Sequence, residues 1–146
     1  MKWVLASIPI VCIGLLFSTV RRTYWMWYPS REDSTVIFPA ISQLGVKDPE
    51  RHVYRSGFVA VGLLLVLHVY ILSIHVVPII CGTDLDAVSL GREFVSRGYQ
   101  AAIGAAMQGF FTLELRVSTS SIIHWIGAAM FMHGAISHAH ASTELY

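Results

Sequence analysis

The chain has 146 residues, of which 55% are hydrophobic and only 13% are charged, and its formal net charge is +1. Soluble domains are on average about a quarter charged, and a short soluble chain leaves too much surface wet to hide this much apolar area. The composition therefore excludes an ordinary soluble domain and predicts an integral membrane protein. Because the chain has no basic tail or acidic block, we expect no nucleic-acid partner.

Four stretches lack Asp, Glu, Lys and Arg, namely residues 3–20, 56–83, 98–113 and 117–143. About 20 helical residues cross a bilayer core roughly 30 Å thick. The second and fourth stretches are long enough, and the first suffices once its flanks are counted. The third is marginal, since it crosses only if Arg97 and Arg116 extend to the interface or Glu114 faces protein.

These stretches predict an all-α, integral membrane four-helix bundle with a structured first loop. The first stretch also has the pattern of a signal peptide, one Lys followed by an apolar run. Its end lacks the small residues of a cleavage site, so we predict a retained span. The whole chain is then a single transmembrane domain, with helices at approximately 3–23, 54–81, 95–115 and 118–141 and a loop at 24–53.

Basic and aromatic residues cluster directly after the first apolar stretch. Arginines followed by amphipathic rings are typical of a membrane–water interface. The alternative is that the rings pack the core of a loop. The predicted interfacial belt consists of Arg21, Arg22, Tyr24, Trp25, Trp27 and Tyr28.

Small residues recur in the third and fourth predicted helices. Ala101, Ala105 and Gly109 are spaced by four residues, and Gly127 and Gly134 by seven. Small residues on one stripe let helix backbones approach in lipid. We therefore expect these two helices to pack as a hairpin, although glycine is common in membrane helices in any case.

Polar residues inside the predicted spans are the candidates for chemistry. His68 and His75 lie two turns apart on one helix face, and Gln108 and His124 lie in later helices. Bis-histidine haem needs facing histidines at matching depths, and zinc needs three or four converging ligands. Neither pattern is present, and no motif for a nucleophile occurs. We predict no catalytic residue, no metal, no haem and no cofactor apart from a bound phospholipid.

Two interpretations stay open for the four polar residues His68, His75, Gln108 and His124. They pair between helices, or they form part of a lipid- or partner-binding site. The two cysteines, Cys12 and Cys81, lie in or at the end of apolar runs, and we expect small buried thiols rather than a disulfide.

The most distinctive motif is P-x-I-S-x-x-G-x-x-x-P-E-R-x-x-Y at residues 39–54, directly before the second predicted helix. Glycine permits a turn with positive φ, proline suits a first helical turn, and glutamate suits the positive end of a helix. A serine here can bond the loop backbone. The motif either only folds the loop or binds a ligand. Its candidate binding residues are Ser42, Gly45, Pro49, Glu50 and Arg51.

This motif, together with His124-x-x-Gly127-Ala128 in the last helix, resembles the DRAM/FRAG family of multispanning membrane proteins. Its Pro-Glu-Arg form is similar to the branch that contains the Golgi factor for GPI-anchor lipid remodelling. The resemblance implies an endomembrane location (Golgi, ER or lysosome), with the first loop in the lumen. The positive-inside rule predicts the opposite orientation, because most Lys and Arg flank the first-loop side. Family members have more spans than the four predicted here.

Two functional hypotheses stay open from the sequence. The small-residue helices and the lack of a visible nucleophile favour a non-catalytic accessory or structural subunit of a larger membrane complex, in a mitochondrial or plastid inner membrane. The resemblance implies instead an endomembrane factor for lipid handling, GPI-anchor remodelling or trafficking. The expected partners are membrane lipids and other membrane-protein subunits. The identity of the molecules that bind the chain discriminates between these two functions.

Overall fold

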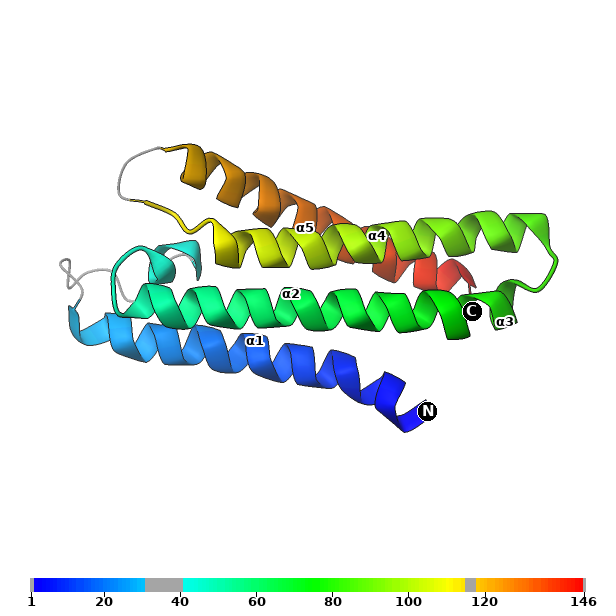
Figure 1. Cartoon of the computed structure of the whole chain (residues 1–146), viewed down its shortest axis with the longest axis horizontal. Helices are drawn as coiled ribbons and strands as arrows, with labels where there is room; N and C mark the ends of the chain where they lie inside the picture. Colours follow the sequence, from blue (N-terminus) through cyan, green and yellow to red (C-terminus); the bar gives the residue numbers. More distant parts are fainter. Residues whose placement is uncertain (1, 31–40, 115–117, 146) are drawn as a thin grey trace.

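The computed structural model describes residues 2–30, 41–114 and 118–145, and within these ranges the chain forms helices and turns but no strand. The predicted all-α class is confirmed. Four long helices run alternately in opposite directions (Figure 1). They are α1 (Lys2–Ser30), α2 (Glu50–His75), α4 (Leu85–Phe110) and α5 (Thr119–Leu145), and the short elements are the 3₁₀ helix η1 (Ile41–Gly45) and α3 (Val77–Cys81).

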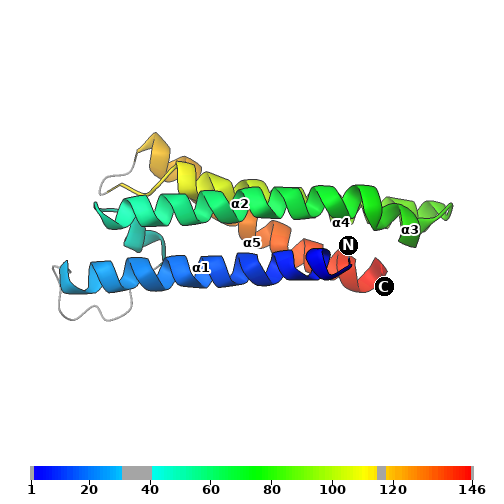
Figure 2. The same cartoon turned by 60° about the horizontal axis from the view of Figure 1, so that its bottom comes forward.

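The long helices form a chain of neighbours. The most extensive contact joins α4 to α5, followed by α2 with α4 and then α1 with α2. Figures 1 and 2 show α1 at the edge of the bundle beside α2, and α5 crossing α4 at an angle. The bundle therefore centres on α4, and α1 is attached mainly through α2.

The backbones of α4 and α5 touch at glycines. A Cβ on Gly104 would lie 2.4 Å from the amide nitrogen of Phe131 and 2.5 Å from the carbonyl oxygen of Gly127. A Cβ on Gly134 would lie 2.5 Å from the amide nitrogen of Ala101. Small residues are required wherever helix axes approach so closely. The structure thus places Ala101, Gly127 and Gly134 in the expected hairpin and adds Gly104, which the sequence did not single out.

Gly109 was expected in the same contact and lies elsewhere. Its Cβ position is 2.7 Å from the amide nitrogen of Val59 and 2.8 Å from the carbonyl oxygen of Arg55, both on α2. A step of four residues rotates about the helix axis by about 40° more than one full turn. Two such steps from Ala101 through the buried Ala105 therefore carry the stripe away from α5 and toward α2.

The first helix is longer than predicted. Residues 24–30, expected in the loop, continue α1 to Ser30. The aromatic rings there pack against one another at tilted or edge-on angles, with the centroids of Tyr24 and Tyr28 5.8 Å apart. The hydroxyl of Thr23 is fully buried and donates to the carbonyl of Thr19 at 2.7 Å. These contacts are local, so they favour helix over loop.

The second predicted helix is divided in two. It starts at Glu50 rather than residue 54, and it ends at His75, before the separate α3. Pro78 explains the break, because proline has no N–H to donate to the preceding turn and its ring crowds that turn. Cys81 ends α3 as a buried thiol, and Cys12 is also a buried free thiol, so the two do not form a disulfide.

The third predicted helix begins and ends earlier than expected. Residues 85–94 were placed in a loop, but α4 starts at Leu85, because the Asp84 carboxylate accepts the amide hydrogens of Asp86 at 3.0 Å and Ala87 at 3.5 Å. This is a typical N-cap. The helix ends at Phe110 rather than near residue 115, and α5 extends to Leu145 rather than 141.

By length and composition, one helical segment in the described part of the chain is able to cross a membrane. This segment is Glu50–Cys81, with a mean hydropathy of 2.4 over its most apolar stretch. Only 11% of that stretch is buried within the bundle. The sequence predicts four membrane spans, and within the described residues one of them meets this criterion.

The α4–α5 contact predicts the effect of a single methyl group. Gly104→Ala places its Cβ against two backbone atoms that have no freedom to move aside, so we expect the free energy of unfolding to fall by about 1–3 kcal/mol. Gly14→Ala is the matched control, because nothing lies within 4 Å of its Cβ position on α1. Thermal unfolding in detergent, followed by circular dichroism, measures both. Equal stability of the two variants would contradict the contact.

Candidate functional site

Buried polar side chains gather where α2 begins, α4 ends and α5 begins. His124 is fully buried, and the exposed fractions are 1% for Tyr54, 3% for Glu50 and 8% for Gln108. The ring centroids of Tyr54 and His124 lie 6.2 Å apart. We call these four residues the polar cluster. Three of its members, Glu50, Gln108 and His124, were predicted as binding candidates. The fourth, Tyr54, is the last residue of the sequence motif.

The tautomer of His124 follows from its hydrogen bond. Its Nδ1 lies 2.7 Å from the carbonyl oxygen of Phe111. A carbonyl only accepts, so Nδ1 carries the proton and donates, which leaves Nε2 of the neutral ring as an acceptor. Within the described residues, this Nε2, the Tyr54 hydroxyl and the Gln108 amide nitrogen are buried without a hydrogen-bond partner. Each of these atoms is able to bond a water molecule or a ligand group.

Residue 45 has to be glycine because a neighbouring side chain packs closely against it, and not because of its backbone angles. Its φ is not positive, and the one glycine with positive φ in the described ranges is Gly82. A Cβ on Gly45 would lie 2.6 Å from Cγ of Tyr54. The expectation of a left-handed turn at Gly45 is therefore wrong. The glycine instead lets η1 rest on the ring of Tyr54, with Leu44 also buried.

The remaining motif residues hold the loop or lie outside the cluster. The Arg51 guanidinium donates to the carbonyl of Val46, which ties the first turn of α2 to the loop. Pro49 is exposed and precedes α2 as its N-cap residue rather than lying in the first turn as expected. The side chain of Ser42 and the motif residues Pro39 and Ala40 lie outside the described residues.

His68 and His75 do not join the polar cluster. His75 is exposed at the far end of α2. His68 lines a separate cavity of about 240 Å³, mostly apolar, together with His138 of α5 and Cys12 of α1. Nδ1 of His138 donates to the carbonyl of Phe94 at 2.8 Å. In the described part of the chain, no three His, Cys, Asp or Glu side chains are placed to hold a metal ion.

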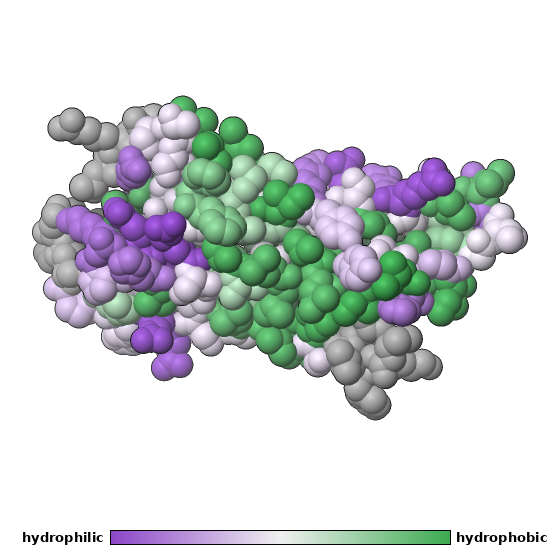
Figure 3. Space-filling view, viewed as in Figure 1, coloured by the Kyte–Doolittle hydropathy of each residue, from purple (hydrophilic) through white to green (hydrophobic). Residues whose placement is uncertain are grey.

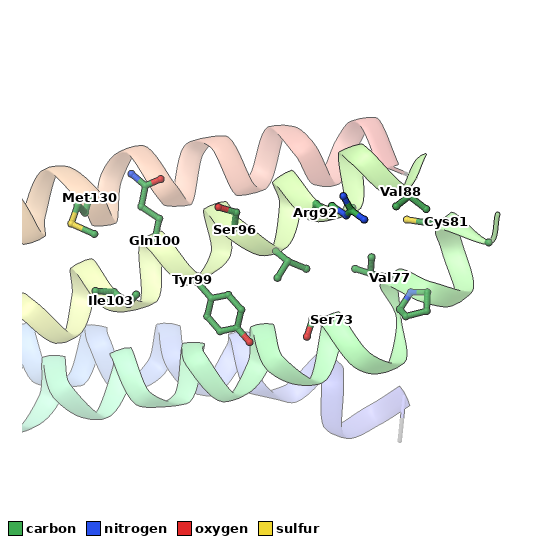
Figure 4. Close-up of a pocket in the computed structure, with 14 residues that line it drawn as sticks. Ser73, Val77, Cys81, Val88, Arg92, Ser96, Tyr99, Gln100, Ile103 and Met130 are labelled. Atoms are coloured by element: carbon green, nitrogen blue, oxygen red, sulfur yellow. The ribbon is translucent and has the colours of Figure 1, made fainter. Parts of the chain in front are cut away.

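A larger groove of about 900 Å³ runs between α2, α3 and α4 (Figure 4). Both Arg92 and Tyr99 of α4 line it, and Ser73 faces them from α2. The sequence carried a signal for it, since Val88, Arg92, Val95, Tyr99 and Ile103 recur every three or four residues as on one helix face. That signal was missed because residues 85–94 were assigned to a loop. We call this feature the α2–α4 groove.

The predicted belt residues lie on the last turns of α1. The rings of Trp25 and Tyr28 are 6.3 Å apart between centroids, and those of Tyr24 and Trp27 are 6.0 Å apart. Arg21, Arg22 and Trp25 are exposed. The rings therefore pack on one another along a helix, with their arginines facing outward.

Comparison with known proteins finds no matching family model, no matching curated protein and no matching solved structure. The resemblance to the DRAM/FRAG family stays a prediction that rests on the loop motif and the His124 patch.

His124 provides a test of the polar cluster. His124→Phe keeps a ring of similar shape but removes the donor to the Phe111 carbonyl, so we expect a loss of about 1–3 kcal/mol in the free energy of unfolding. The control is His140→Phe on the same helix. His140 is exposed and lies 3.9 Å from the carboxylate of Glu144, and such exposed pairs contribute little to stability. Denaturant unfolding in detergent gives both values. A His124→Phe variant as stable as the control would show that the buried bond has no structural role.

Proposed function

We propose that the chain is an integral membrane protein that serves as a non-catalytic accessory subunit of a larger membrane complex. The main support for the membrane location is that large apolar side chains are exposed on every long helix. Soluble monomers rarely expose contiguous apolar patches larger than a few hundred Å². The exposed side chains include Ile10, Ile13 and Phe17 on α1, Leu63, Leu67 and Ile74 on α2, Ile103 and Phe110 on α4, and Ile122, Ile126 and Ile136 on α5.

The distribution of polarity along the bundle supports the same location. Figure 3 displays one face, on which apolar residues gather over the middle while hydrophilic residues lie at the end where α2 begins and along the first part of α4. Between residues 119 and 143, α5 has no Asp, Glu, Lys or Arg. Its most buried polar residue, His124, already bonds a carbonyl, which lowers the cost of placing it at membrane depth.

The outer face of α1 supports a contact with another subunit. Val11, Gly14 and Ser18 are exposed and lie on one side of the helix, and nothing lies within 4 Å of a Cβ placed on Gly14. Helix association in lipid relies on close packing at such small residues. We assign to this face a transmembrane helix of a neighbouring subunit, whose backbone approaches α1 at Gly14.

The second candidate function is lipid handling in endomembranes, as the DRAM/FRAG resemblance implies. The α2–α4 groove favours it, because its volume of about 900 Å³ lies in the range of small-molecule sites, which combine apolar walls with a few polar groups. In that case the chain holds a lipid without needing a protein partner on α1.

A bulky residue on the outer face of α1 tests the subunit role. In gently solubilised native membranes, we expect the wild-type chain to migrate in a particle larger than the monomer. Gly14→Leu should lower the assembled fraction about five-fold or more, because it holds the partner helix away. Ala129→Leu adds similar bulk to the exposed side of α5 and should leave the assembly intact. Native gel electrophoresis with antibody detection measures the fraction.

Two results would contradict this role. The first is a wild-type chain that runs as a monomer when extracted from native membranes, which would favour lipid handling instead. The second is an equal loss of assembly in Gly14→Leu and Ala129→Leu, because the effect would then not be specific to α1.

A further inference from the structure

The lining of the α2–α4 groove changes in character along its length. At the middle of the bundle it is apolar, with Ile103 of α4 and Met130 of α5. Toward the end where α3 lies, the face of α4 presents Tyr99, then Ser96, then Arg92 to the groove. The wall opposite Arg92 stays apolar, with Val77 and Pro78 of α3. Figure 4 shows the hydroxyl of Tyr99 pointing across the groove toward Ser73 of α2. The order from apolar to hydroxyl to cation follows the order of chemical groups along an amphiphile.

The spacing of these residues matches one leaflet of a bilayer. Ile103 and Arg92 are eleven residues apart in one continuous helix, which is about 16 Å at the rise of an α-helix. Half of a bilayer's hydrocarbon core is about 15 Å. With Ile103 near the bilayer midplane, Arg92 therefore lies at the level of the headgroups, and Ser96 lies one turn deeper, at the level of the ester groups.

Arg92 is the cation available to a ligand at this end of the groove. The nearby Arg97 pairs with Glu93 at 3.5 Å and bonds Gln100 at 3.2 Å. Arg92 is exposed, and in the described part of the chain it has no carboxylate within ion-pair distance. An arginine without an acidic partner is well suited to a phosphate, which its planar guanidinium binds with two parallel hydrogen bonds.

Fixed contacts between α3 and α4 form the wall at the outer end of the groove. A Cβ on Gly91 would lie 2.7 Å from Sγ of Cys81 and 2.7 Å from Cγ1 of Val77. The thiol of Cys81 also donates to the carbonyl of Ala87 at 3.0 Å. These contacts hold α3 on α4, so the wall beside Arg92 is part of the folded bundle.

We propose that the α2–α4 groove holds one anionic glycerophospholipid, with its phosphate on Arg92, its ester groups near Ser96 and one acyl chain along Val95 and Ile103. The proposal rests on the membrane location proposed above. A partner helix fits the groove less well, because it would bury Arg92 and Tyr99 under an apolar surface. The groove also lies on a different side of α2 from α1, so it is separate from the face assigned to a neighbouring subunit.

Native mass spectrometry tests the proposal with defined lipids. The full chain, purified in mild detergent, is mixed with equal amounts of palmitoyl-oleoyl phosphatidylglycerol and palmitoyl-oleoyl phosphatidylcholine. We expect one bound lipid per chain, with phosphatidylglycerol preferred. Arg92→Gln should lower that preference about five-fold. Arg55→Gln is the matched control, an exposed arginine near the start of α2 at the opposite end, and it should leave the preference unchanged.

A second variant tests the apolar part of the groove. Val95→Trp fills the space for the acyl chain, so it should remove both lipids. Arg92→Gln should weaken mainly the binding of phosphatidylglycerol, because the phosphate of phosphatidylcholine is already neutralised by the choline cation of its own headgroup. An unchanged preference in Arg92→Gln, or a polypeptide bound in place of lipid, would overturn the proposal. Failure of the membrane location itself is a separate result, seen when an alkaline wash releases the wild-type chain from native membranes.

Discussion

The close approach of α4 and α5 is the constraint on which the rest of the structure depends. Their backbones meet at Gly104 and Gly134, where no side chain fits. Once the middle of the pair is fixed, two histidines of α5 bond carbonyl groups, one just beyond the end of α4 and one within α4. His124 bonds Phe111 at one end, and His138 bonds Phe94 at the other while its ring stacks on the Phe94 ring at 4.1 Å. Glycine contacts and two directed hydrogen bonds therefore set both the separation and the register of the pair.

The packing of the described helices leaves open the α2–α4 groove and, separately, the outer face of α1. One side of α4 is taken by α5, and a second side meets α2, where a Cβ on Gly62 would lie 2.7 Å from the amide nitrogen of Ala106. The remaining side forms the α2–α4 groove. On the opposite side of α2, α1 docks where Gly57 meets Thr19, and its outer face stays uncovered. The proposed lipid and the proposed partner subunit thus use different surfaces, and neither needs to displace the other.

The sequence predicted features that depend on local patterns. Apolar runs and small-residue spacing were sufficient for the all-α class and for a pairing of the last two long helices. The start of α4 was missed because Asp86, Arg92 and Glu93 suggested a loop, although the Asp84 cap was visible in the sequence. The reason for Gly45 was hidden, because it depends on a ring nine residues later that packs back onto the loop. The bond from His124 to Phe111 depends on where α4 ends, which no short pattern specifies.

The most direct test of the account is the sidedness of positions along the helices in sealed membrane vesicles. Single cysteines are introduced in a chain whose own Cys12 and Cys81 are replaced by alanine, and they are labelled with a maleimide that does not cross membranes. If the bundle crosses the bilayer, position 52 reacts from one side only, positions 86 and 144 react only from the opposite side, and positions 63 and 126 react from neither. Labelling of positions 52, 86 and 144 from the same side would contradict a bundle that crosses the bilayer.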